Sequence, residues 1–150
     1  MRKNILSISQ NEIQESKYLI DVSGYKIGRC ATYIAQILLG KLNPRVRSNL
    51  DPMVKVFVIN ASQLDVTQKR KETTFFSRYS GYPGGLKFEN LGELMESNPA
   101  KALILVVKGM LPKTKIGRKV ISRLYVYNHG IDNNYEQNVL IKLDLSNLKL

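Results

Sequence analysis

The sequence predicts an α/β fold, and three features of the chain indicate it. Two strand-like runs, residues 17–22 and 54–59, flank a run of helical apolar periodicity at 28–38. A second, strongly apolar helix is predicted over 99–110, and another strand over 124–127. Strand, helix and strand within about 45 residues make a βαβ unit, so we expect a parallel strand pair. The length of 150 residues indicates a single folded domain.

The first helix is predicted from a change of period after the Ser23-Gly24 turn. Its apolar residues recur at helical spacing and share one face. These residues are Ile27, Ala31, Ile34, Ala35 and Leu38. Gly40 stands where a helix C-cap belongs, and Pro44 follows it. The strand at 54–59 is apolar except for Lys55, which is typical of a buried strand.

Shorter secondary-structure elements are predicted in the middle of the chain. Residues 71–79 are rich in threonine and aromatic side chains and are expected to be extended, and 91–96 is a short helix candidate. Residues 80–85 hold three glycines and a proline, which predicts a loop.

The helix at 99–110 has a rival interpretation, because the run 103–107 fits a buried strand equally well by periodicity. Ser97 or Asn98 as N-cap and Pro99 at the first helical position favour the helix. Pro112 ends it, residues 113–123 form a basic loop that opens a second short helix, and a final element is expected within 139–145.

The charge indicates a polyanionic partner. Lysine and arginine number 23 against 12 acidic residues, a formal net charge of +11. The excess is shared by both halves of the chain, and residues 98–131 carry seven basic residues and no acidic one. A folded basic domain of this kind is typical of nucleic-acid binding, with a solvated charged surface as the alternative.

Several function classes are excluded by composition. One cysteine and one histidine exclude a disulfide framework, a multi-thiolate zinc site and a two-histidine zinc motif. The longest apolar run has six residues, far short of the roughly 20 of a membrane helix. Cys30 is expected to be a buried core residue, and no metal, cofactor or catalytic group is predicted.

Two glycine-containing turns invite a phosphate-binding interpretation. Residues 24–29 join the first strand to the first helix but supply only two of the three glycines of a dinucleotide fingerprint. A nucleotide-binding enzyme that uses this turn therefore stays open as a weak alternative. Residues 81–87 lack the Gly-Lys-Ser/Thr spacing of a P-loop, but the flanking cations and tyrosines suit RNA phosphates and bases, with a purely structural loop as the alternative.

The most informative stretch is 108–119, in which five cations alternate with two glycines and a proline. Tight bends would project these cations into an RNA groove, and each phosphate contact adds about one unit of salt dependence. Together with the strings Asp21–Arg29, Val58–Ala61, Ser80–Lys87 and Val107–Lys113, this stretch resembles the bacterial form of the large-subunit ribosomal protein thirteen family. Gly40-Lys41 with Pro44, Gly117-Arg118 and Leu124–Tyr127 complete a resemblance that covers about residues 17–128 in family order.

The resemblance implies a three-layer α/β/α fold around a largely parallel four-stranded sheet. It also implies a structural protein without catalysis that binds large-subunit rRNA early in assembly, beside neighbouring ribosomal proteins, with no membrane and no small-molecule substrate. An RNA-binding regulator that acts off the ribosome is the alternative. We expect an N-terminal arm at 1–16, the α/β domain at 17–128 and a divergent C-terminal extension at 129–150.

The candidate RNA-binding side chains are cations and exposed tyrosines near the three basic regions. They are Arg29, Lys41, Arg45, Arg47, Lys69, Arg78, Tyr79, Tyr82, Lys87, Lys108, Lys113, Lys115, Arg118, Lys119 and Arg123. The residues expected to shape the loops are Gly81, Pro83, Gly84, Gly85, Gly109, Pro112 and Gly117.

The chain departs from the family pattern at several places. Tyr79 replaces a usual histidine, Met53-Val54 replaces Gly-Asp, Leu39 replaces arginine, and Gln68 replaces glycine. The usual His-Pro-His segment is missing from 128–138. These departures predict a divergent ribosome, with a mitochondrion or plastid favoured over a fast-evolving bacterium.

Overall fold

The computed structural model describes residues 15–43, 50–130 and, as strand backbone only, 141–143. The expectations for the 1–14 portion of the arm, for Arg45 and Arg47, and for most of the C-terminal extension lie outside these residues. The strands are β1 (Ser16–Asp21), β2 (Val54–Ile59), β3 (Phe75–Tyr79), β4 (Leu86–Asn90), β5 (Leu124–Val126) and β6 (Ile141–Leu143). The helices are α1 (Ile27–Leu38), α2 (Gln68–Thr73), α3 (Leu91–Ser97), α4 (Pro99–Met110) and α5 (Lys115–Ile121), with a 3-10 turn at Ala61–Gln63.

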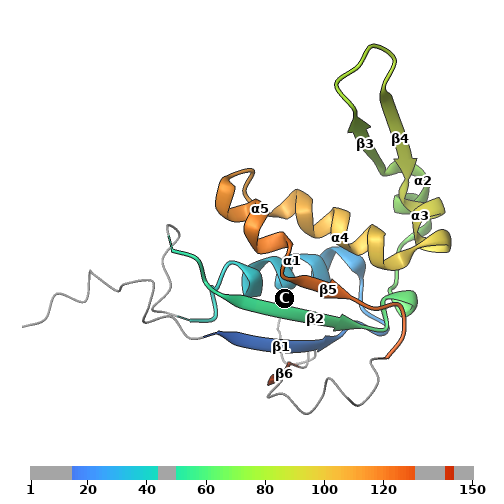
Figure 1. Ribbon diagram of the computed structural model, residues 1–150. Coiled ribbons are helices and arrows are strands. Elements are labelled where there is room, and N and C mark those ends of the chain that lie inside the picture. Colours follow the sequence, from blue (N-terminus) through green and yellow to red (C-terminus); the bar gives the residue numbers. More distant parts are fainter. Residues whose placement is uncertain (1–14, 44–49, 131–140, 144–150) are drawn as a thin grey trace, which may run out of the picture.

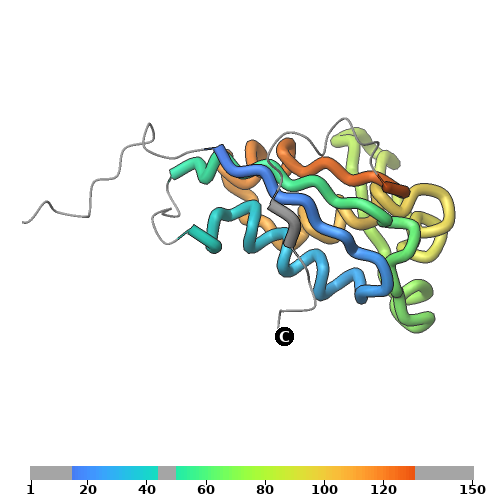
Figure 2. The backbone as a smooth tube through the Cα atoms, turned by 90° about the horizontal axis from the view of Figure 1, so that it is seen from below, coloured from blue at the N-terminus to red at the C-terminus, as the bar shows by residue number. Residues whose placement is uncertain are grey.

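The main sheet is parallel throughout and has the order β5-β2-β1-β6. Its register pairs Tyr18 with Val56, and Val56 with Leu124. Helices α1, α4 and α5 all lie on one side of this sheet (Figure 1), and the view from below shows β1, β2 and β5 in front of them (Figure 2). The predicted α/β class and parallel strand pair are confirmed.

The expected three-layer α/β/α arrangement is wrong for the described residues. Among the described residues, no helix covers the second face of the sheet, so the part of the molecule that the structure describes has two layers. On that second face the ring of Phe57 stacks on Tyr125, with centroids 5.1 Å apart. The remaining short helices of the described chain, α2 and α3, lie at the base of a hairpin instead (Figure 1).

The core lies between the sheet and the two long helices. Ile20 and Val56 are fully buried on the inner face of the sheet, beneath Ile34 of α1 and Leu103 and Val107 of α4. Burial alternates along β2, as a strand with one covered face requires. Cys30 belongs to this core, and burial raises the pKa of its thiol to about 11, which makes the thiolate scarce at neutral pH.

The predicted helix signals are confirmed at both long helices. Gly40, with φ +72°, follows α1 and donates its N–H to the Ile37 carbonyl at 2.8 Å. Lys41 N–H reaches the Gln36 carbonyl at 3.0 Å, which completes a Schellman motif. The Asn98 side chain accepts the Lys101 N–H at 3.0 Å, so the cap selects the helix over the rival strand at 103–107.

The expectation of an extended segment at 71–79 is wrong for its first half. Residues 68–73 form α2, in which the Gln68 side chain bonds Glu72 at 2.9 Å across one turn. No residue of α2 is buried, so the segment carries no apolar period that would have revealed it. The second half becomes β3, and β3 pairs antiparallel with β4 outside the main sheet. The resulting β3–β4 hairpin projects away from the body (Figure 1).

Candidate nucleic-acid interface

The basic stretch after α4 folds into a compact bend. Thr114 caps α5 by accepting the Gly117 N–H at 3.4 Å. A Cβ on Gly117 would lie 1.9 Å from the Pro112 carbonyl oxygen, so only glycine lets α5 lie this close to the preceding loop. Gly109 differs, because nothing lies within 4 Å of the place of its Cβ.

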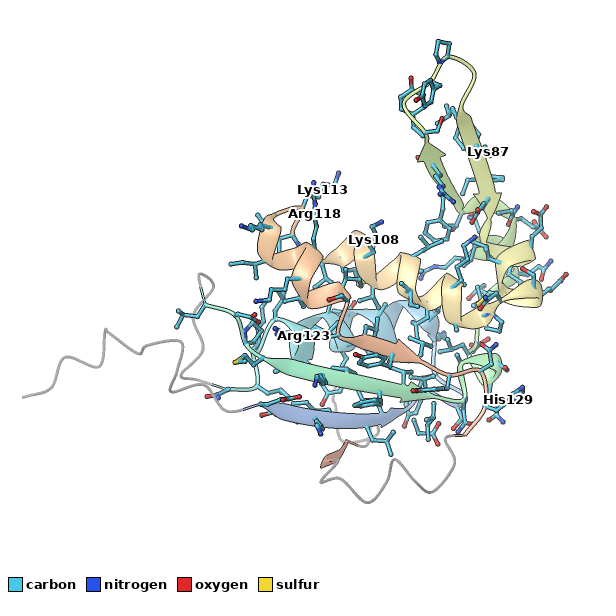
Figure 3. All side chains as sticks on the ribbon, in the orientation of Figure 1. Lys87, Lys108, Lys113, Arg118, Arg123 and His129 are labelled. Atoms are coloured by element: carbon cyan, nitrogen blue, oxygen red, sulfur yellow. The ribbon has the colours of Figure 1, made fainter. Side chains whose placement is uncertain are left out.

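Three exposed cations project from this bend. Lys108 of α4, Lys113 of the loop and Arg118 of α5 extend to the side from which the hairpin rises (Figure 3). In the part of the chain that the structure describes, none of the three forms an ion pair with a carboxylate. Lys115 is also exposed, at the start of α5.

Two other predicted cations are held by one carboxylate. Asp51 Oδ2 lies 2.8 Å from Lys119 Nζ and 2.7 Å from Arg123 Nη2, and Asp51 Oδ1 accepts a further bond from Arg123 Nη1. Burial raises the pKa of Asp51, but the bonds from Arg123 and Lys119 outweigh it and hold that pKa well below its ordinary range. The Arg123 side chain is only 16% exposed, so it ties the fold together rather than facing an outside partner.

The β3–β4 hairpin closes through its predicted glycine loop. Gly81 and Gly84 have φ of +93° and +74°, which glycine adopts without strain. Gly85 donates its N–H to the Tyr82 carbonyl at 2.9 Å, and its carbonyl accepts the Ser80 N–H at 3.3 Å. Tyr82, beside Pro83, is 75% exposed at the tip.

The two faces of the hairpin differ in chemistry. Cross-strand pairing places Arg78 beside Lys87 on one face. The other face, which we call the apolar hairpin face, carries large side chains that are each at least half exposed. These are Phe75, Tyr79, Leu86 and Phe88.

A groove separates the hairpin from the α4–α5 bend, and we call it the hairpin groove. It encloses about 670 Å³. Phe75 and Ser77 line its hairpin side, while Lys108, Lys113 and Arg118 line its helical side. Strand β3 of the hairpin and the basic stretch 108–119, separate in the sequence, therefore contribute to one concave surface.

The expected cationic edge around the first helix is only partly assembled. Arg29 lies at the N-terminal end of α1 and Lys41 beyond its C-terminal end, about 18 Å apart for a helix of 12 residues. Arg29 instead joins Lys26 and Arg70 around a second groove of about 470 Å³. The Arg70 guanidinium lies so close to Gly28 that a Cβ there would be 2.9 Å from Nη1.

Sequence reasoning missed three residues of these surfaces. Arg70 belonged to no motif, Lys26 stood in the 24–29 turn without being named as a site residue, and Phe75 was counted only as part of an extended segment. Lys69, which was predicted, is exposed on α2. The described residues contain no cluster of three potential metal ligands and no helix long and apolar enough to cross a bilayer.

Comparison with known proteins decides the family. The model of the ribosomal protein L13 family matches residues 15–132. The chain belongs to the ribosomal protein L13 family. The large ribosomal subunit protein uL13 of Lactobacillus delbrueckii subsp. bulgaricus is 39% identical over 138 residues, which is 92% of this chain and 93% of the relative.

Two further relatives are also uL13 proteins. The uL13 protein of Caldanaerobacter subterraneus is 38% identical over 135 residues, or 90% of this chain and 94% of its own. The uL13 protein of Listeria welshimeri is 40% identical over 116 residues, which is 77% of this chain and 80% of the relative. All three organisms are bacteria, so the expected organellar origin of this L13 chain is not supported. The nucleotide-binding alternative at residues 24–29 gains no support from the family.

Proposed function

We propose that this chain is a structural protein of the large ribosomal subunit, where it binds rRNA and supports early assembly and translation. The observation that carries the proposal is the L13 family match over residues 15–132. The net charge of +11 is consistent with it, since a surface of this charge favours a polyanionic partner. The bacterial relatives favour a bacterial ribosome over a mitochondrial or plastid one.

Of the cations predicted from the sequence, those that are exposed and have no ion pair in the described chain are proposed to bind rRNA phosphates. They are Arg29, Lys41, Lys69, Arg78, Lys87, Lys108, Lys113, Lys115 and Arg118. Tyr79 and Tyr82, which are 63% and 75% exposed, are proposed to meet bases or riboses. Arg45 and Arg47 remain proposals from sequence alone, as do an N-terminal arm at 1–16 and a C-terminal extension at 129–150, although Ser16 lies in β1 and residues 141–143 pair with β1 in the main sheet.

The proposed contacts are exposed cations and tyrosines, so the proposed role is binding of RNA rather than catalysis. RNA helices hide their base edges in a deep, narrow groove, so we expect recognition of shape and backbone rather than sequence. Neighbouring large-subunit proteins are proposed as additional partners.

Sedimentation tests this function. Tagged protein in a lysate of the source cell is run on sucrose gradients at moderate and at high salt. Co-migration with the large subunit that survives high salt is the expected result. Protein confined to the top of the gradient would overturn the proposal, and a regulatory role off the ribosome would then come first.

A further inference from the structure

The hairpin groove has an aromatic side that faces a cationic side. Phe75 is 57% exposed although it lies at the base of the hairpin, next to the body of the protein. Along the same face, Tyr79 and Phe88 are 63% and 65% exposed. Clustered exposed aromatic side chains of this kind mark a surface that binds something.

The opposite side of the groove is positive. Lys108, Lys113 and Arg118 line it, and the described lining contains no acidic residue. These three cations have no carboxylate partner in the described chain, unlike Lys119 and Arg123, which share Asp51. A ligand that fills this groove is therefore expected to carry negative charge.

The two sides together select among ligands. An RNA duplex offers phosphates, but its bases are stacked inside and leave nothing for an aromatic ring to cover. An uncharged protein surface would cover the aromatic side chains but leave three cations desolvated without partners. An unpaired RNA strand offers a flat π-face and a phosphate in every repeat unit.

We propose that the hairpin groove holds an unpaired nucleotide segment of RNA, with a base stacked on Phe75 and flanking phosphates on Lys108, Lys113 and Arg118. This rests on the proposed function as an rRNA-binding protein and adds the class of RNA element to it. A volume of about 670 Å³ lies within the range of sites that enclose small organic ligands, roughly 300–1,000 Å³.

The test compares two aromatic substitutions in the full-length protein. Phe75→Leu removes the ring but keeps an apolar side chain. Tyr125→Leu is the matched control, because Tyr125 is also an exposed aromatic residue, at 41%, but lies on the second face of the main sheet. Both variants are first checked for unchanged thermal unfolding.

Binding of a short fluorescein-labelled oligouridylate and of an RNA duplex of equal length is measured by anisotropy over a range of salt. We expect Phe75→Leu to weaken oligouridylate binding about tenfold with an unchanged salt slope, since a stacked base contributes without releasing counterions. Duplex binding should change less than about twofold, and Tyr125→Leu should alter neither. Cross-linking with 4-thiouridine should modify the peptide that contains Phe75.

Three results would overturn the proposal. If both variants bind oligouridylate as wild type does, the groove holds no base, although rRNA binding elsewhere stands. If Phe75→Leu instead abolishes a cross-link to a neighbouring protein in the purified large subunit and leaves RNA binding intact, the groove is a protein contact. If wild-type protein binds neither RNA and does not sediment with the large subunit, the proposed function fails together with the groove.

Discussion

Asp51 and Arg123 join the entrances of two neighbouring parallel strands. Asp51 lies three residues before β2, and Arg123 lies directly before β5. Arg123 Nη2 is 2.7 Å from Asp51 Oδ2, and Arg123 Nη1 bonds the second carboxylate oxygen. The two side chains are 14% and 16% exposed, so water does little to weaken the pair. This contact fixes where the short strand β5 enters the sheet.

Loss of this pair should destabilise the fold. We expect Arg123→Met to lower the free energy of unfolding by about 2 kcal/mol, because a mostly buried carboxylate loses its two-point partner. Urea unfolding followed by circular dichroism measures the change. Arg118→Met is the matched control, since Arg118 is exposed and forms no ion pair in the described chain, and it should stay within about 0.5 kcal/mol of wild type. Equal losses in the two variants would contradict the assignment.

The same carboxylate predicts an acid-dependent loss of stability. Burial raises the pKa of Asp51, but the bonds from Arg123 and Lys119 prevail and leave the folded-state pKa well below the ordinary value of about 3.9. The stabilising contribution is thus complete above about pH 5 and declines as pH falls toward the folded-state pKa, because the unfolded chain takes up the proton first.

Urea unfolding across this range checks the sign, and Asp51→Asn should flatten the decline. Part of the decline should persist in that variant. Burial raises the pKa of Asp21, but bonds from Ser23 N–H and the Asn60 amide, both at 3.0 Å, lower it overall. An Asp51→Asn variant with the full wild-type pH dependence would refute the contribution of Asp51.

The elements that the sequence predicted are those with local signals. Gly40 and Asn98 mark helix ends through bonds to residues within a few positions, so their meaning can be recognised without the fold. Helix α2 has no buried residue, so it shows no apolar period on which prediction depends. Strand β4 does alternate apolar and polar residues over 86–89, but it is only five residues long and was not among the predicted elements.

The candidate site was predicted as a list of cations but not as an arrangement. Charge pattern alone does not distinguish Arg118 from Arg123, because the carboxylate that engages Arg123 is 72 residues away in the chain. Likewise, Phe75 acquires its place opposite Lys108 only when the hairpin and the α4–α5 bend are brought together. Contacts between residues far apart in the sequence therefore determine both the pairing of Arg123 and the position of Phe75.

Two helical glycines should respond in opposite directions to alanine. Gly117→Ala should lower the free energy of unfolding by about 1–3 kcal/mol, because its Cβ would meet the Pro112 carbonyl oxygen at 1.9 Å. Gly109→Ala should raise it by about 0.5–1 kcal/mol, since the space is open and alanine favours the helix. Thermal unfolding of the two variants measures both changes, and destabilisation of similar size in each would contradict the close approach at Gly117.

Met53 holds a backbone conformation that suits glycine. Its φ is +51°, and its N–H bonds the Asp51 carboxylate at 3.2 Å. The family pattern usually has glycine at the position of Met53, and the left-handed backbone conformation explains that preference. Met53→Gly should be more stable than Met53→Ala by about 1 kcal/mol, because both remove the side chain and differ only in the cost of this φ. Lys69, within helix α2, supplies the control pair, in which alanine should be the more stable.

The three cations of the hairpin groove should account for a measurable part of the salt dependence of RNA binding. Replacing Lys108, Lys113 and Arg118 together by alanine should reduce the magnitude of the slope of log K against log salt by about two to three, if each holds one phosphate. The measurement is a titration of labelled large-subunit rRNA transcript at several salt concentrations. Lys101→Ala is the control, because Lys101 lies on the same helix but its Nζ is 2.7 Å from the Glu89 carboxylate. An engaged cation releases no phosphate counterion, so this variant should retain the wild-type slope. A triple variant with that same slope would show that these cations face solvent rather than RNA.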